Sequence, residues 1–258
     1  MNQNPQVTIA EYNESYASIK EISDIFYHNY KQVGNINSFE AVRYAMKAKY
    51  KHFADLIICG SLVIFFLIPF LLLTKNHSFN PLTTALISIT LSLILNYGIF
   101  GYYLVHRMNK MHLDHGKELI KRFQDINTRY FDAGGKYWIA LLQSSAQEKP
   151  KVVGHLGLYK DKPEDLKEKK LGSTLKNGHL EMMGVNSNYR ELGIGKKLVQ
   201  EAIKFAEKEK FDSLSLWVLN INYKAISLYK KYGFHIIDTF ELEPLTGLTV
   251  LFMIRKII

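Results

Sequence analysis

Apolar residues along this chain follow two spacings, one typical of strands and one typical of helices. Short strand-like runs cover 6–10, 136–142, 152–159, 180–185, 214–218, 235–240 and 248–254. Helical spacing covers 16–30, 108–131, 195–208 and 225–232. The 195–208 segment is the most regular, with Leu198, Val199, Ala202, Ile203 and Ala206 on one face. These two periods predict an α/β fold.

Two further runs lack charge altogether. Residues 56–74 form an uncharged run of 19 residues, and residues 78–105 form one of 28. About 20 helical residues cross a bilayer core, so these runs predict a transmembrane hairpin through 56–74 and 81–105. Asn80-Pro81 is a good start for the second helix. A buried helical hairpin and a re-entrant hairpin are the alternatives.

Basic residues flank both sides of this hairpin, whereas the connecting loop holds only Lys75. By the positive-inside rule both flanks face the cytosol. The expected organisation is therefore 1–54 as the first strand and helices of a domain, 55–105 as the hairpin insert and 106–258 as the domain core. Residues 39–53 have an apolar stripe, which either lies on an anionic lipid surface or packs on its own domain.

Composition narrows the function classes. The net charge is +9, yet no basic run is interleaved with aromatics, so nucleic acid is not an expected partner. Cys59 is the single cysteine, which excludes an internal disulfide. Residues 1–6 are polar, so no cleaved secretory signal is expected. The mixed charges of residues 161–178 predict an exposed loop.

A glycine pair follows the strand at 180–185 and opens the helix at 195–208. Gly193-Ile194-Gly195-Lys196-Lys197 would let backbone approach a ligand closely, and the N–H groups at a helix start suit a phosphate pair. It is not a Walker loop. It is not the dinucleotide fingerprint either, because Leu198 holds the position that needs a third glycine or alanine.

A second motif lies downstream, in Asn222-Tyr223-Lys224-Ala225-Ile226-Ser227-Leu228-Tyr229 with Gly233-Phe234 after it. Taken alone, Tyr229 is a core aromatic on a short helix. Taken together, the two motifs resemble those of the GNAT family of acyl-CoA-dependent N-acetyltransferases. Arg190, Gly193 and Gly195 match the first family motif, and the second is matched by Asn222, Ala225, Tyr229, Gly233 and Phe234.

This resemblance implies a mixed sheet, splayed near its middle and flanked by helices, into which the transmembrane hairpin is inserted. It also implies acetyl-CoA as co-substrate and no metal. Backbone groups of Met183, Gly184 and Val185 would meet the acetyl-pantetheine arm, and an amide there could stabilise the oxyanion. The pyrophosphate would be held by Arg190, Glu191, Leu192, Gly193, Ile194, Gly195, Lys196 and Lys197.

The resemblance further implies roles for individual side chains. Asn222 would meet the cofactor near the pantetheine, and Tyr229 would protonate the departing thiolate. Glu181 is the candidate general base, with His179 nearby; each could instead be a strand-end residue that only hydrogen-bonds. Glu191 departs from the family pattern by placing a carboxylate beside the loop, and so does Ser187, where proline is common.

A narrower resemblance is to the camello-like branch, which includes cysteine-S-conjugate and aspartate N-acetyltransferases and has a hydrophobic hairpin in the same place. It implies an integral protein of the endoplasmic reticulum membrane with its catalytic domain facing the cytosol, acting on a small amino-acid-like amine. Protein lysine acetylation is the alternative, and a catalytically silent acetyl-CoA-binding membrane adaptor is the alternative of another class. A di-iron histidine-box enzyme, prompted by His106, His112 and His115, is a rival of another class; the spaced boxes are missing, so these histidines are interpreted as solvated helix residues.

Overall fold

The computed structural model describes residues 6–33, 70, 80–143, 149–172, 175–243 and 248–257. The chain divides into two compact units, which are treated separately. One comprises 1–33, 113–240 and 250–258, and it holds most of the sheet and the predicted site. The other comprises 34–112 and 241–249.

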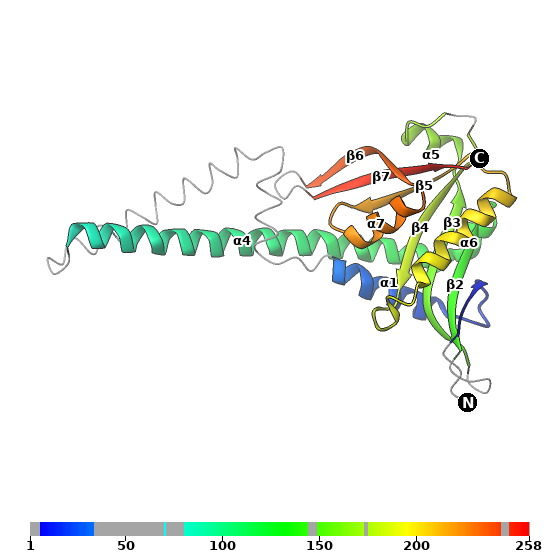
Figure 1. Cartoon of the computed structure of the whole chain (residues 1–258), viewed down its shortest axis with the longest axis horizontal. Coiled ribbons are helices and arrows are strands. Elements are labelled where there is room, and N and C mark those ends of the chain that lie inside the picture. The colour runs from blue at the N-terminus through cyan, green and yellow to red at the C-terminus, as the bar shows by residue number, and fades with distance from the viewer. Residues whose placement is uncertain are drawn as a thin grey trace. The chain divides into compact units, whose positions relative to one another are not determined.

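A seven-stranded mixed sheet forms the centre of the fold, in the order β1-β2-β3-β4-β5-β7-β6 (Figure 1). The β1–β2, β2–β3, β3–β4 and β5–β7 pairs are antiparallel, and β4–β5 is parallel. This confirms the mixed α/β sheet. The strands are β1 (Gln6–Glu11), β2 (Lys136–Gln143), β3 (Lys151–Lys160), β4 (Asn177–Val185), β5 (Ser213–Leu219), β6 (His235–Glu243) and β7 (Leu248–Lys256).

The structure corrects one predicted helix and one predicted loop. The predicted helix at 108–131 is the continuation of a longer helix, α4, which runs to Lys121 and is followed by the short turns η1 and η2. The predicted loop at 161–178 contains the short helix α5, whose start is held by a hydrogen bond of 2.8 Å from Lys162 N to Asp165 Oδ2. The helical elements are α1 (Ile19–Val33), α4 (Pro81–Lys121), η1 (Arg122–Asp125), η2 (Asn127–Phe131), α5 (Pro163–Glu168), η3 (Ser187–Tyr189), α6 (Ile194–Lys208) and α7 (Tyr223–Lys231).

The predicted transmembrane hairpin is also corrected. Within the ranges that the structure describes, no helix combines the length and the apolar character that a membrane crossing needs. This finding contradicts the inserted hairpin and the integral-membrane location. Segment 81–105 lies in α4 and starts at Pro81 as predicted, with Asn80 Oδ1 accepting from Leu82 N at 2.9 Å. The prediction relied on the absence of charged residues, which is a weaker condition than continuous apolar character. Segment 56–74, apart from Phe70, lies outside the described residues.

Each face of the sheet carries its own apolar cluster. On one face α6 packs over β2, β3 and β4 through residues such as Leu198, Val199 and Ala202 (Figure 1). The opposite face is covered by α1, η1 and η2. Strand alternation explains the division, because Trp138, Ala140 and Leu142 of β2 join the first cluster, whereas Tyr137, Ile139 and Leu141 join the second.

The sheet opens at one point, between β4 and β5. These strands pair only from Asn177–Ser213 to Leu180–Leu216. Beyond that point β4 continues against β3, and β5 continues against β7. The splay implied by the family resemblance is therefore present, and it begins at Glu181.

Just past this opening, β4 contains a bulge. Met182 has a φ of +55°, and the register between β3 and β4 shifts between His155 and Gly157. Glu181 and Met182 both reach the α1 side of the sheet, whereas Met183 packs on the α6 side. The extra residue thus reverses the alternation of the strand where the sheet separates.

Candidate active site

The predicted phosphate loop forms a tight, left-handed approach to α6. Gly193 has φ +72° and ψ +12°, and an added Cβ would meet nothing within 4 Å. Glu191 also has a positive φ, of +69°. The α6 ladder begins with Lys197 N donating to Gly193 O at 3.0 Å, so the amides of the first turn are left for an outside acceptor. This open, amide-lined helix start fits a pyrophosphate.

Two basic side chains of this loop make hydrogen bonds within the protein. Lys197 Nζ donates to the carbonyl of Val7 in β1 at 2.9 Å, so its side chain ties the helix to the sheet. Arg190 is exposed and donates to Asn29 Oδ1 of α1 at 2.5 Å. Lys196, Glu191 and Leu192 are exposed. The structure therefore brings the loop residues together but gives Lys197 a structural partner.

Helix α7 carries Tyr229 to the opening. Its hydroxyl lies 3.3 Å from Met183 Sδ, and its ring stacks edge-on against Phe234 with centroids 5.8 Å apart. Tyr229 is buried, and burial raises the pKa of its phenol, so the hydroxyl keeps its proton at neutral pH. Gly195 is part of the same neighbourhood, because a Cβ there would lie 2.9 Å from Met183 Cε.

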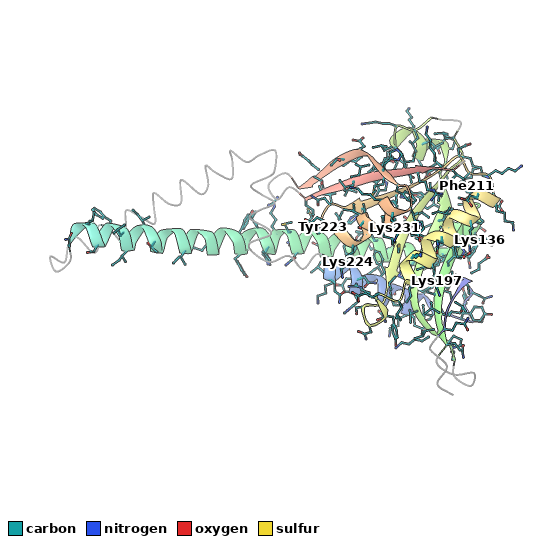
Figure 2. The ribbon with its side chains drawn as sticks, in the orientation of Figure 1. Lys136, Lys197, Phe211, Tyr223, Lys224 and Lys231 are labelled. Atoms are coloured by element: carbon teal, nitrogen blue, oxygen red, sulfur yellow. The ribbon has the colours of Figure 1, made fainter. Side chains whose placement is uncertain are left out.

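Asn222, predicted to meet the cofactor, caps the start of helix α7. Its Oδ1 accepts from Ala225 N at 3.3 Å, which makes it the N-cap of α7. Tyr223 and Lys224 follow it in the first turn of the helix and are exposed (Figure 2). The side chain of Asn222 thereby fixes the start of the helix that presents Tyr229.

Glu181 is held by two neighbours from η2. Arg129 donates to its carboxylate through Nε and through Nη2, the latter at 2.9 Å, and the Tyr130 hydroxyl donates to it at 2.9 Å. Burial, reinforced by the Glu181 charge, raises the pKa of Tyr130, so that hydroxyl remains a donor. The carboxylate lies on the α1 side of β4, opposite Tyr229.

His179 lies deeper in the fold. It is buried, and its Nδ1 makes a 2.9 Å hydrogen bond with Ser215 Oγ. Asn177 Nδ2 donates to the same hydroxyl at 2.7 Å and to Asp161 Oδ2 at 2.7 Å. Asp161 is also paired with Lys169 at 2.5 Å. These polar groups join β4 to β5 below the opening.

Sequence reasoning missed several residues around the site, among them Asn29, Arg129, Tyr130 and His155. Arg129 and Tyr130 are about 50 positions from Glu181, and no local spacing connects them. Gly184 in a strand was one available signal, since a strand glycine often marks a close approach. In the part of the chain that the structure describes, no group of three or more His, Cys, Asp or Glu is placed to hold a metal.

Comparison with known proteins agrees with this geometry. Residues 105–234 match the model of the acetyltransferase (GNAT) family. The chain is 34% identical over 127 residues to the probable N-acetyltransferase san of Drosophila melanogaster, covering 47% of this chain and 66% of that protein. It is 34% identical over 110 residues to N-acetyltransferase family 8 member 2 of Rattus norvegicus, covering 43% of each.

A third relative is the N-acetylaspartate synthetase of Xenopus tropicalis, with 28% identity over 126 residues, 48% of this chain and 40% of that protein. The matches thus span less than two thirds of each relative. Among solved structures, an acetyltransferase of the GNAT family from Staphylococcus aureus Mu50 has a TM-score of 0.51 at 17% identity, covering 98% of this chain and 100% of that one. The structural likeness supports the fold.

Proposed function

Because the chain belongs to the acetyltransferase (GNAT) family, we propose that it moves the acetyl group of acetyl-CoA to the amine of a small amino-acid-like acceptor. One observation carries this proposal: the buried hydroxyl of Tyr229 lies against Met183 where β4 and β5 part. The name of the Xenopus relative, N-acetylaspartate synthetase, supports a small acceptor. Acetyl-CoA is the co-substrate, as the family implies.

The glycine loop supplies the anchor for the co-substrate. The first-turn amides of α6 and the left-handed Gly193 suit the pyrophosphate, because N–H groups at a helix start attract anions. Arg190 adds positive charge at this end, and Asn29 fixes where it points. From this anchor the opening beside Met183, Gly184 and Val185 leads between β4 and β5.

Tyr229 would then act as the general acid. When the amine nitrogen bonds to the acetyl carbon, the carbon–sulfur bond breaks and the sulfur leaves with the electron pair. A protonated phenol at the opening can give its proton to that sulfur. The raised pKa of Tyr229 keeps the proton on the phenol before transfer.

Glu181 lies on the other face of β4, and the proton lost by the attacking amine could be taken there. Arg129 and Tyr130 fix the orientation of its carboxylate but also occupy part of its capacity as an acceptor. The same two contacts anchor η2 to β4, so Glu181 has a structural role beside the proposed role as base. The acceptor would approach from the α1 side and the thioester from the α6 side.

The test is a panel of amines incubated with labelled acetyl-CoA and the full-length chain. The panel contains free amino acids, cysteine S-conjugates, peptides with a free N-terminus, peptides with internal lysine and polyamines. We expect label on an amino acid or conjugate, with Tyr229→Phe slowing turnover and leaving the affinity for CoA unchanged. Tyr223→Phe is the matched control, since Tyr223 is exposed on the same helix.

Two results would contradict the proposal. Labelling of lysine peptides in preference to small amines would assign a protein acceptor. Tight CoA binding without acetylation of any amine would assign a binding role in place of turnover.

A further inference from the structure

His155, in β3, is a buried titratable residue that the proposed chemistry does not use. Its ring lies parallel to that of Tyr137, with an interplanar angle of 7° and centroids 6.1 Å apart. Phe123 packs edge-on against it with centroids 5.7 Å apart, and Phe26 closes a third side. These three rings, from β2, η1 and α1, fix the imidazole in one orientation.

The two ring nitrogens have different surroundings. Nδ1 lies 2.8 Å from Tyr137 OH. Nε2 is buried, makes no hydrogen bond to the described residues and lies against the backbone of Gly184. Burial lowers the pKa of His155 to about 3, so the ring is neutral at neutral pH and carries one N–H.

Tyr137 is the hydrogen-bond partner of the imidazole at Nδ1. Burial raises the pKa of Tyr137 well above its usual value, so its hydroxyl keeps its proton and can donate or accept. When Tyr137 donates, Nδ1 is the acceptor and the proton lies on Nε2, directed at Gly184 beside the bulge of β4.

Gly184 makes this approach possible. It pairs with His155 across the two strands, and a Cβ at position 184 would lie 2.4 Å from His155 Nε2. The imidazole therefore fills a notch that only glycine leaves. The ring therefore lies against the residue of β4 that directly follows Met183.

We propose that His155 is a positioning residue for acetyl transfer: seated in the Gly184 notch, with Tyr137 donating to Nδ1 and the proton on Nε2, its ring holds β4 beside the bulge and so fixes the Met183–Val185 backbone toward the acetyl-pantetheine arm. This inference rests on the proposed function. It differs from a packing role, because an apolar residue of similar size would fill the space without burying a polar nitrogen. From the described elements packed against the ring, the titratable group facing it is Tyr137.

Three substitutions separate the two nitrogens. His155→Gln places an amide N–H near the position of Nε2, whereas His155→Asn keeps only a group near Nδ1, and His155→Phe keeps the ring shape alone. Gly184→Ala perturbs the same contact from the other strand. Gly178→Ala is its control for crowding on the same strand, since the added Cβ there meets Leu214 Cδ2 at 2.8 Å and the Phe211 ring at 3.2 Å and is not near His155.

Kinetics on folded variants give the first readout. We expect His155→Asn and His155→Phe to lower kcat roughly 100-fold, with KM for acetyl-CoA changed far less, because a misplaced reacting group costs about this much. His155→Gln should restore most of kcat. Gly184→Ala should resemble His155→Asn, and Gly178→Ala should resemble the wild type. Wild-type kcat in folded His155→Asn and His155→Phe would overturn the proposal.

The second readout needs no turnover. Nitrogen-15 NMR of histidine-labelled protein identifies the tautomer, and the His155 signals are assigned by their loss in His155→Gln. Protonated Nε2 and bare Nδ1 are expected. A proton on Nδ1 would overturn the proposal, even if the wild type acetylates an amine; failure of every amine in the panel would instead contradict the proposed function, and the tautomer would still decide the His155 contact.

Discussion

The neutrality of His155 has a measurable effect on stability. Its pKa lies at about 3 in the folded chain, against the ordinary histidine pKa of 6.5, which represents the unfolded chain. Between pH 6.5 and pH 3 the unfolded chain binds a proton at His155 that the folded chain does not bind. The free energy of unfolding therefore falls as the pH drops through this range. A pH of 5 lies 1.5 units below the unfolded-state pKa of 6.5. At about 1.36 kcal/mol per unit, the free energy of unfolding is about 2 kcal/mol lower at pH 5 than at neutral pH.

The assay is urea unfolding of the wild type and of His155→Gln at pH 7.5 and pH 5. Other groups also titrate in this window. Burial raises the pKa of Asp161, which favours the folded state as pH falls, while backbone hydrogen bonds lower the pKa of Glu21 and of Asp238, which acts in the opposite direction. These contributions are common to both proteins, so they cancel in the difference between them.

We therefore expect the wild type to lose about 2 kcal/mol more than His155→Gln between the two pH values. The free energy of unfolding, with its denaturant slope, is the measured quantity. Equal losses in the two proteins would show that His155 can be protonated within the fold at little cost. Such a result would refute the inference that the rings of Tyr137, Phe123 and Phe26 shield the imidazole from water.

Three other outcomes follow from the site. Gly193→Ala and Gly134→Ala should each cost about 1 kcal/mol of stability, because both residues have φ near +72° with open space, yet only the former should weaken acetyl-CoA binding in calorimetry. Tyr229→Phe should lower kcat about 100-fold and change stability by less than about 1 kcal/mol. Glu181→Gln should cost about 2 kcal/mol by leaving Arg129 without its counter-ion; an unchanged kcat in that folded variant would remove Glu181 from the chemistry.

The mixed sheet was predictable because its strands carry strong apolar runs. The helix from Ile194 to Lys208 was equally accessible, since its apolar face keeps a regular period and a glycine precedes it. The two motifs led to the family because each places a few residues at fixed spacing. Each of these signals is local in the chain, which is why the sequence alone carries them.

The contacts that hold the site residues in place could not be predicted from local sequence spacing. The pairing of Glu181 with Arg129 joins segments 52 positions apart, and their adjacency follows only from the packing of η2 on the sheet. The bulge at Met182 leaves no trace in the alternation of apolar residues, because Met182 and Met183 are equally apolar but face opposite clusters. The hairpin prediction failed for a related reason, since a run without charge does not say how a helix is used.

The position of the opening follows from where polar side chains join β4 to β5. Asn177 and His179 alternate along β4 and bond the Ser213 and Ser215 hydroxyls opposite them, with Asn177 anchored to Asp161. This buried network covers the length over which the strands pair and stops where the pairing ends, at Leu180. Beyond it β4 contains the bulge and stays paired with β3 but not with β5, and the imidazole of His155 in β3 lies against Gly184. The network holds the strands together on one side and the bulge separates them on the other, so the opening for the acetyl arm is set from both ends.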